Sequence, residues 1–381
     1  MYHNFREPSA SCVKLHSGSI MRTTLTALIA TLLCAVGHAQ QPQMSEEVFK
    51  NIQVLKGIPV SQFMETMGFF SASLGVNCTY CHVQEAGGNW AKYADDNGHK
   101  QMTRRMVLMM QSMNKANFGG RRALTCYSCH RGDERPRTTP SLVDLYGPPI
   151  SIDADDIFET DPKAPAAEQI FDKYLKALGG TLTSFTAKGS FQGYAEQDKS
   201  PVEVFAKAPN QRATVIHRKV GDSTTVYDGR GAWSAAPSTE VPVTLLPLSG
   251  SDLDALKVDA ELTFPANIKK MFMTWRVGFP STIDDRDVLV VQGTSPGRAR
   301  VKLYFDKETG LLARSVRYTD SPVGLNPTQT DYSDYRDVAG AKFPFHWTTT
   351  WLDGRSTTEL SELKPNVQID ASKFAKPVAP K

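Results

Sequence analysis

The sequence has little cysteine, little net charge and no long hydrophobic run after its first 40 residues. It contains 6 cysteines in 381 residues and carries a formal net charge of +3. No later stretch approaches the roughly 20 consecutive apolar residues of a transmembrane helix. No basic stripe indicates a nucleic-acid partner, and no nucleophile elbow, phosphate-binding loop or metalloprotease motif indicates those enzyme classes.

Length and patterning predict two folded domains behind a leader, because 381 residues exceed one ordinary core. We expect a signal peptide at 1–39, a mainly helical domain with all four cysteines of the expected mature chain at 40–135, a Pro-rich acidic linker at 136–164 and a β-rich domain at 165–381. The fold class is α+β with two domains. A mainly helical domain precedes an antiparallel β-sheet with packed helices, flat or curved as a half-barrel.

The N-terminal segment has the pattern of an export signal. Met21, an alternative start, is followed by Arg22 and the apolar run 23–36. Gly37 and Ala39 are the small residues that precede signal cleavage, here after Ala39. The alternative is an uncleaved membrane anchor. We therefore expect the protein in the periplasm or on the outer face of the cytoplasmic membrane.

The expected mature chain keeps four cysteines, arranged as two C-x-x-C pairs that each precede a histidine. The motifs are Cys78-Thr79-Tyr80-Cys81-His82 and Cys126-Tyr127-Ser128-Cys129-His130. In a short helix, residues i, i+3 and i+4 share one face, so both thiols and the imidazole point the same way. Such thiols form thioethers to the haem vinyl groups while the histidine binds iron. The sequence thus predicts two covalently attached c-type haems.

Other uses of paired cysteines explain less of the pattern. Two disulfides suit an oxidising compartment but leave the histidines unexplained. A four-cysteine zinc site accounts for the paired spacing but not for the histidines or the export signal. A thioredoxin-like redox pair requires a βαβ setting that the pattern lacks.

Residue type alone does not identify the sixth ligand of either iron. Methionine is a good axial ligand, but it also fills irregular cores. His99 is the one spare histidine near the motifs, and His217 and His346 fit ordinary strand positions. The candidate methionines are Met44, Met64, Met67, Met102, Met106, Met109, Met110 and Met113.

Apolar spacing predicts the local structure. Two helices are expected within 45–74, one over 100–116 and one over 166–178, with a helical insertion in 252–276. Gly75 should end the helix before the first motif, and Asn77 and Thr125 should cap the two motif helices. Turn signals at 306–310 and at Asp353-Gly354 predict hairpins in the β-rich part.

The segment that carries the motifs resembles a known family. The run VLKGIPVSQFMETM from Val54 to Met67 precedes the first motif, and Arg104-Arg105-Met106 with Asn114 precedes the second. Over about 45–135 this resembles the cytochrome c subunit of photosynthetic reaction centres. The stretch from Asp334 to Pro344 is loosely similar to periplasmic lipoprotein-carrier folds.

The resemblance implies axial ligands and a function. The family's axial methionines fall on Met67 for the first haem and Met106 for the second, with Met64 and Met109 or Met110 as alternatives. The family subunit carries four haems, whereas this chain has two motifs. A shortened relative in respiratory or other extracytoplasmic electron transfer is therefore expected as readily as a photosynthetic one.

We interpret the chain as a dihaem electron carrier, not an enzyme, that exchanges electrons with a membrane complex or a small soluble carrier. One alternative is a dihaem peroxidase-like enzyme with an open iron position. Another is a β-rich domain that binds an apolar ligand or a partner protein, with the haems as redox sensor.

Overall fold

The computed structural model describes residues 41–140, 142, 158–194 and 196–380. The predicted signal peptide and the acidic run of the predicted linker, at 143–157, lie outside these residues. None of the helices within the described ranges is both long enough and apolar enough to cross a membrane.

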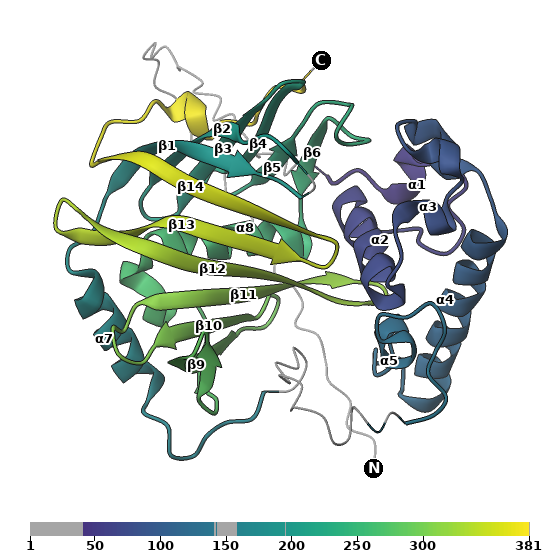
Figure 1. Ribbon diagram of the computed structural model, residues 1–381, viewed down its shortest axis with the longest axis horizontal. Helices are drawn as coiled ribbons and strands as arrows, with labels where there is room; N and C mark the ends of the chain where they lie inside the picture. The colour runs from purple at the N-terminus through teal and green to yellow at the C-terminus, as the bar shows by residue number, and fades with distance from the viewer. Residues whose placement is uncertain (1–40, 141, 143–157, 195, 381) are drawn as a thin grey trace, which may run out of the picture. The chain divides into compact units, whose positions relative to one another are not determined.

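Five helices make up the segment that contains the two motifs (Figure 1). They are α1 (Ser45–Val48), α2 (Val60–Leu74), α3 (Cys78–Cys81), α4 (Gly98–Asn117) and α5 (Cys126–His130), with the short turns η1 (Gln84–Ala86) and η2 (Trp90–Ala94) before α4. Gly75 ends α2 with φ at +66°, as predicted. Thr125 caps α5 as predicted, since its hydroxyl accepts from the backbone N–H of Ser128. Asn77 precedes α3, but its side chain makes no capping bond to the backbone; it accepts from the hydroxyl of Thr79 at 3.0 Å.

The described β-strands form a single 14-stranded sheet, which confirms the predicted antiparallel sheet. Its order is β6-β5-β4-β3-β2-β1-β14-β13-β12-β11-β10-β9-β7, with β8 paired to β9. The strands are β1 (Ser184–Gln192), β2 (Ser200–Lys207), β3 (Gln211–Arg218), β4 (Gly221–Tyr227), β5 (Ala232–Ala235), β6 (Leu245–Leu248), β7 (Thr274–Val277), β8 (Ser281–Ile283), β9 (Arg286–Thr294), β10 (Val301–Asp306), β11 (Leu312–Ser321), β12 (Gly324–Val338), β13 (Ala341–Trp351) and β14 (Gly354–Pro365).

Turn chemistry sets the register of the predicted hairpins. In the β10–β11 turn the carboxylate of Asp306 accepts from the backbone N–H groups of Glu308 and Thr309, and Gly310 supplies a φ of +76°. The β13–β14 hairpin closes with Trp351 paired to Gly354.

Two helices cover the sheet. They are α7 (Ala167–Leu178) and α8 (Gly250–Thr263), while η3 (Pro265–Lys270) and η4 (Ala371–Phe374) are short turns. Figure 1 shows α8 behind the strands. Phe171 and Tyr174 of α7 and Val258 of α8 are buried in one cluster with Leu303 and Phe305 of β10. The apolar face of α7 therefore packs against the sheet.

The tip of the β11–β12 hairpin enters the helical segment. Val323, at that tip, is fully buried and packs with Phe69 of α2 and with Val107 and Met110 of α4. Gly324 is required beside it, because a Cβ there would overlap the ring of Phe69. The hairpin therefore completes an apolar cluster that the helices cannot close alone.

A polar layer borders that cluster. The amide of Gln62 donates to the Asp320 carbonyl at 2.8 Å, and the hydroxyl of Thr319 donates to the Glu65 carboxylate at 2.6 Å. Arg122 pairs with Asp320. Burial, assisted by the charge of Asp252, raises the pKa of Glu65 to about 7. The contact between α2 and the sheet is therefore specific as well as apolar.

We predict that Phe69→Ala destabilises the protein by about 3–5 kcal/mol, because it leaves a cavity between α2, α4 and the hairpin. Phe279→Ala is the matched control, since that ring is 53% exposed and its loss should cost no more than about 0.5 kcal/mol. Urea unfolding of both variants measures the difference. Equal losses of unfolding free energy in the two variants would show that the cluster does not join the helices to the sheet.

Candidate haem sites

The first motif lines a cavity of about 440 Å³ within the helical segment. Cys78, Cys81 and His82 reach it from α3 and the residue after it, and Met64 and Met67 reach it from α2. Both thiols, the imidazole and the expected thioether therefore face one space. This is the donor set that c-type haem attachment requires.

The rest of the cavity wall is mainly apolar. Phe49 and Phe63 stack there with ring centroids 4.9 Å apart. The further apolar side chains that line it include Val48, Ile52, Val54, Leu55, Phe70, Leu74, Val76, Trp90 and Val107. A flat apolar macrocycle would find contact on most of its surface here.

The imidazole of His82 is oriented by a backbone carbonyl. Its Nδ1 lies 3.1 Å from the carbonyl oxygen of Tyr93, at the end of η2. A carbonyl can only accept, so Nδ1 carries the proton and the Nε2 lone pair is free to bind a metal. Burial lowers the pKa of His82, which favours the neutral ring that ligation needs.

Charged groups also border the cavity. Lys100 and Arg104 of α4 line it, as does Asp353 from the β13–β14 turn. The carboxyl of Asp353 lies against Gly68, since a Cβ on that glycine would be 3.1 Å from it. The sequence predicted neither the Tyr93 carbonyl nor Asp353. Only the paired Arg104-Arg105 before Met106 gave a sequence signal for this wall.

The second motif repeats the histidine geometry. Nδ1 of His130 lies 3.1 Å from the carbonyl oxygen of Asp133, which again leaves Nε2 free. Arg131 ends α5 in the left-handed conformation, with φ at +52°, and this turn brings the carbonyl back to the ring. Each motif has one exposed cysteine, Cys78 or Cys129. The second setting is more open because Tyr127 is 56% exposed, whereas its counterpart Tyr80 is half-buried.

Buried polar contacts fix the second motif to α4 and α2. Asn114 of α4 is buried, and its amide donates to the Leu124 carbonyl at 2.8 Å and accepts from the Leu124 N–H at 2.9 Å. Gly132, after α5, donates its N–H to the carbonyl of Ser73 at 2.9 Å. A side chain on Gly75 would overlap the carbonyl of Gly132, so glycine is required there.

The expected axial methionines stay predictions, and the structure shows where each lies. Met67 is half-buried in the first cavity, and Met64, the alternative, lines the same cavity but is 37% exposed. Met106 is half-buried on α4, whereas Met110 is buried in the cluster with Phe69. Packing thus gives Met110 a structural role.

Two further candidates from the sequence lie away from the first cavity's lining. Met109 is 48% exposed on α4. The ring of His99 lies tilted against that of Tyr80 of the first motif, with ring centroids 4.1 Å apart. Neither side chain is positioned by buried contacts.

The four thiols are unpaired, so neither C-x-x-C pair forms a disulfide. Burial raises the pKa of Cys126 to about 11 and also raises that of Cys81. Across the described ranges no three or more His, Cys, Asp and Glu side chains gather as a metal cluster.

The segment has relatives among known proteins. Residues 23–144 match the family model of the photosynthetic reaction centre cytochrome c subunit. The subunit of that name from Thermochromatium tepidum is 39% identical over 98 residues, which are 24% of this chain and 23% of the relative. The one from Roseobacter denitrificans is 28% identical over 102 residues, 25% of this chain and 27% of the relative. This chain therefore spans about a quarter of the length of these relatives.

Solved structures overlap the chain at lower similarity. A LolA superfamily protein from Nitrosomonas europaea covers 56% of this chain and 99% of its own, with a TM-score of 0.40 and 16% identity. A DUF1329 family protein from Desulfovibrio piger covers 56% of this chain and 98% of its own, with a TM-score of 0.40 and 14% identity.

We predict that each motif attaches one haem independently. Replacing both Cys126 and Cys129 by Ala should lower the intact mass by one haem and leave the first haem in place, because its thiols and histidine lie in a separate cavity. Thr79→Ala is the control and should keep both haems. The protein must come from a host that attaches c-type haem. An unchanged mass with bound zinc would contradict the assignment.

Proposed function

We propose that this protein is an extracytoplasmic dihaem electron carrier. The observation that carries the proposal is the repeated motif geometry: each histidine keeps Nδ1 on a backbone carbonyl 3.1 Å away and leaves Nε2 free. The family match over residues 23–144 supports a c-type cytochrome. A bound haem supplies one-electron chemistry at its iron.

The residues of each site have separate tasks. Cys78 and Cys81 would hold the first haem, with His82 and Met67 as axial ligands. In the second site, the same tasks fall to the set Cys126, Cys129, His130 and Met106. Covalent attachment prevents loss of the group, and the apolar wall of the first cavity excludes water from it.

The two sites share side chains, which supports electron transfer between them. Phe70 and Val107 line the first cavity, and both also belong to the apolar cluster on which Cys126 packs. That cluster therefore borders the first cavity and also contacts the second motif. The helices that carry the cluster are held by the hydrogen bonds of Asn114 and by the hairpin tip, so the two motifs keep a fixed arrangement.

The exposed second motif favours exchange with a partner protein. Tyr127 is 56% exposed there, whereas its counterpart Tyr80 is half-buried. The first motif lines a cavity bordered by Pro242 and Asp353, which lie in loops between strands of the sheet. We propose the second haem as the place where a membrane complex or small soluble carrier docks. Because the chain has two haem motifs, we propose that it serves respiratory or other extracytoplasmic electron transfer. The export pattern of the N-terminal segment supports a location in the periplasm or on the outer face of the cytoplasmic membrane.

A dihaem peroxidase-like enzyme is the second candidate, and methionine ligation separates the two. A carrier keeps both irons six-coordinate, whereas an enzyme needs an open position. Met67 and Met64 both line the cavity that holds His82, so a sixth ligand is at hand for the first iron.

We predict that the oxidised protein shows the weak far-red absorption of iron–methionine bonding. Met67→Ala and Met106→Ala should each remove part of this band and lower the potential of the corresponding haem, since thioether ligation raises it. Met109→Ala should leave the spectrum unchanged. A high-spin spectrum in the unsubstituted protein would favour the enzyme.

A further inference from the structure

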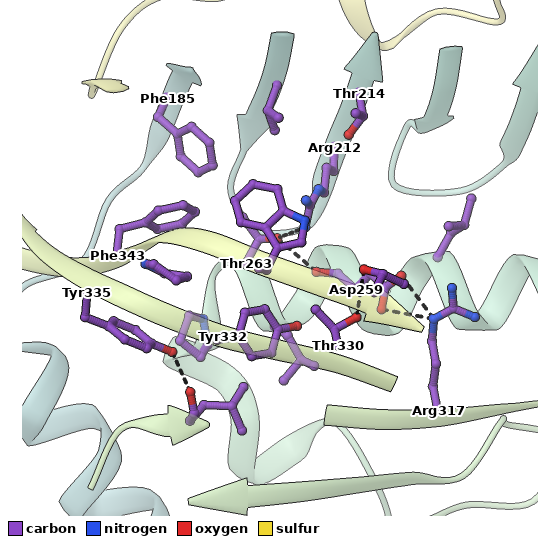
Figure 2. Close-up of a pocket in the computed structure, with 18 of the residues that line it drawn as sticks. Phe185, Arg212, Thr214, Asp259, Thr263, Arg317, Thr330, Tyr332, Tyr335 and Phe343 are labelled. Atoms are coloured by element: carbon purple, nitrogen blue, oxygen red, sulfur yellow. Dashed lines mark hydrogen bonds and ion pairs between the residues drawn. The ribbon is translucent and has the colours of Figure 1, made fainter. Parts of the chain in front are cut away.

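A second cavity, of about 200 Å³, lies in the β-rich part. Figure 2 shows much of its lining, and strands of the sheet, α7, α8 and η3 all contribute residues to it. It is distant in sequence from both haem motifs and shares no lining residue with the first cavity. No step of the electron-transfer proposal uses it.

A backbone irregularity in β12 accompanies two tyrosines that both line this cavity. Tyr332 and Tyr335 are three residues apart and would face opposite sides of a regular strand. Asp334 between them takes a φ of +52° without shifting the register against β13, and both rings line the cavity. The hydroxyl of Tyr335 donates to the Leu312 carbonyl at 2.8 Å, and that of Tyr332 lies 3.2 Å from the Ser315 hydroxyl. With their hydroxyls engaged, the tyrosines contribute flat ring surface.

Three cationic side chains and one carboxylate line the cavity: Arg212, Arg317, Lys342 and Asp259. Lys342 is exposed, so solvent screens its charge. Arg317 is neutralised, since its Nε lies 3.1 and 3.2 Å from the two carboxylate oxygens of Asp259. Arg212 of β3 has a different environment: it donates to the neutral hydroxyl of Thr263 at 3.0 Å and lies over the ring of Trp347 at 5.9 Å. Among the described residues no carboxylate pairs with it. A guanidinium held this way retains donors for an anion.

Threonines and aromatic rings surround that guanidinium. Thr214 and Thr225 are cross-strand partners on β3 and β4 and line the cavity near Arg212. Phe185, Phe343 and Trp347 supply the apolar wall. A ligand that fits would join one anionic group to a compact apolar body.

Volume limits the size of that body. A cavity of about 150 Å³ accommodates benzene in a well-studied case. The present 200 Å³ therefore suits a single ring with one small substituent. A long acyl chain would exceed it, and a ligand with two charges would leave one of them against the aromatic wall.

We propose that this cavity binds a small aromatic monocarboxylate of about benzoate size, with its carboxylate on Arg212 and its ring between Phe343 and Trp347. Binding of the carboxylate is non-covalent, so no covalent bond forms or breaks and no co-reactant is needed. This inference goes beyond electron transfer and does not depend on it. It revises the expected purely apolar ligand to one with an anionic end.

The test is isothermal titration calorimetry, in which the haem-loaded full chain is titrated separately with benzoate, benzamide and dodecanoate. We expect one benzoate per chain, and benzamide, its neutral isostere, about tenfold weaker or more, because it loses the charge-assisted bonds. Arg212→Gln should weaken benzoate by about tenfold, while Arg212→Lys, which keeps the charge, should lose less. Arg230→Gln, an exposed site with the same charge change, should have no effect.

Thr214→Phe keeps the test decisive if Arg212→Gln does not fold. It fills the cavity without changing charge, so benzoate binding should disappear while haem absorbance stays the same. Absence of benzoate binding, or equal affinity in Arg212→Gln, would overturn the proposal. Tight dodecanoate binding that ignores Arg212 would also overturn it, in favour of an acyl-chain site.

Discussion

The apolar cluster around Val107 is the contact on which the rest of the described chain depends. Val107 is almost fully buried, lines the first haem cavity and packs with Phe69 and with Val323 of the β11–β12 hairpin. Cys126 of the second motif packs on the same cluster. One group of side chains thus positions both motifs and holds the sheet against them. Loosening it would alter both sites and their separation together.

The helical segment has few buried apolar side chains of its own. Its buried apolar side chains are Leu55, Val60, Phe69, Ala86, Val107 and Met110, against a much larger set in the sheet. Small cores need additional constraints, such as covalent or metal links. Two thioether-bound groups would supply them by filling the first cavity and fixing α3 and α5. Haem attachment, in this account, serves folding as well as electron transfer.

The sequence predicted what depends on local spacing. The motif helices, the stop at Gly75, the Thr125 cap and the hairpins at Asp306 and Asp353 all follow from chemistry within a few residues. Contacts between distant residues left no such signal. The Tyr93 carbonyl on His82 and the entry of Val323 between α2 and α4 arise from chain reversals that periodicity does not encode. Asn77 occupies the predicted N-cap position, but its side chain accepts from the hydroxyl of Thr79 and makes no capping bond to the backbone.

Potentiometric titration of the haem-loaded protein, followed in its visible absorption, tests the central claim most directly. Two closed haem sites in different surroundings, one in a cavity and one exposed, should titrate as two one-electron components of equal amplitude with separate midpoints. A single component whose absorbance change corresponds to one haem per chain would contradict the account, because only one motif would then hold a haem that exchanges electrons.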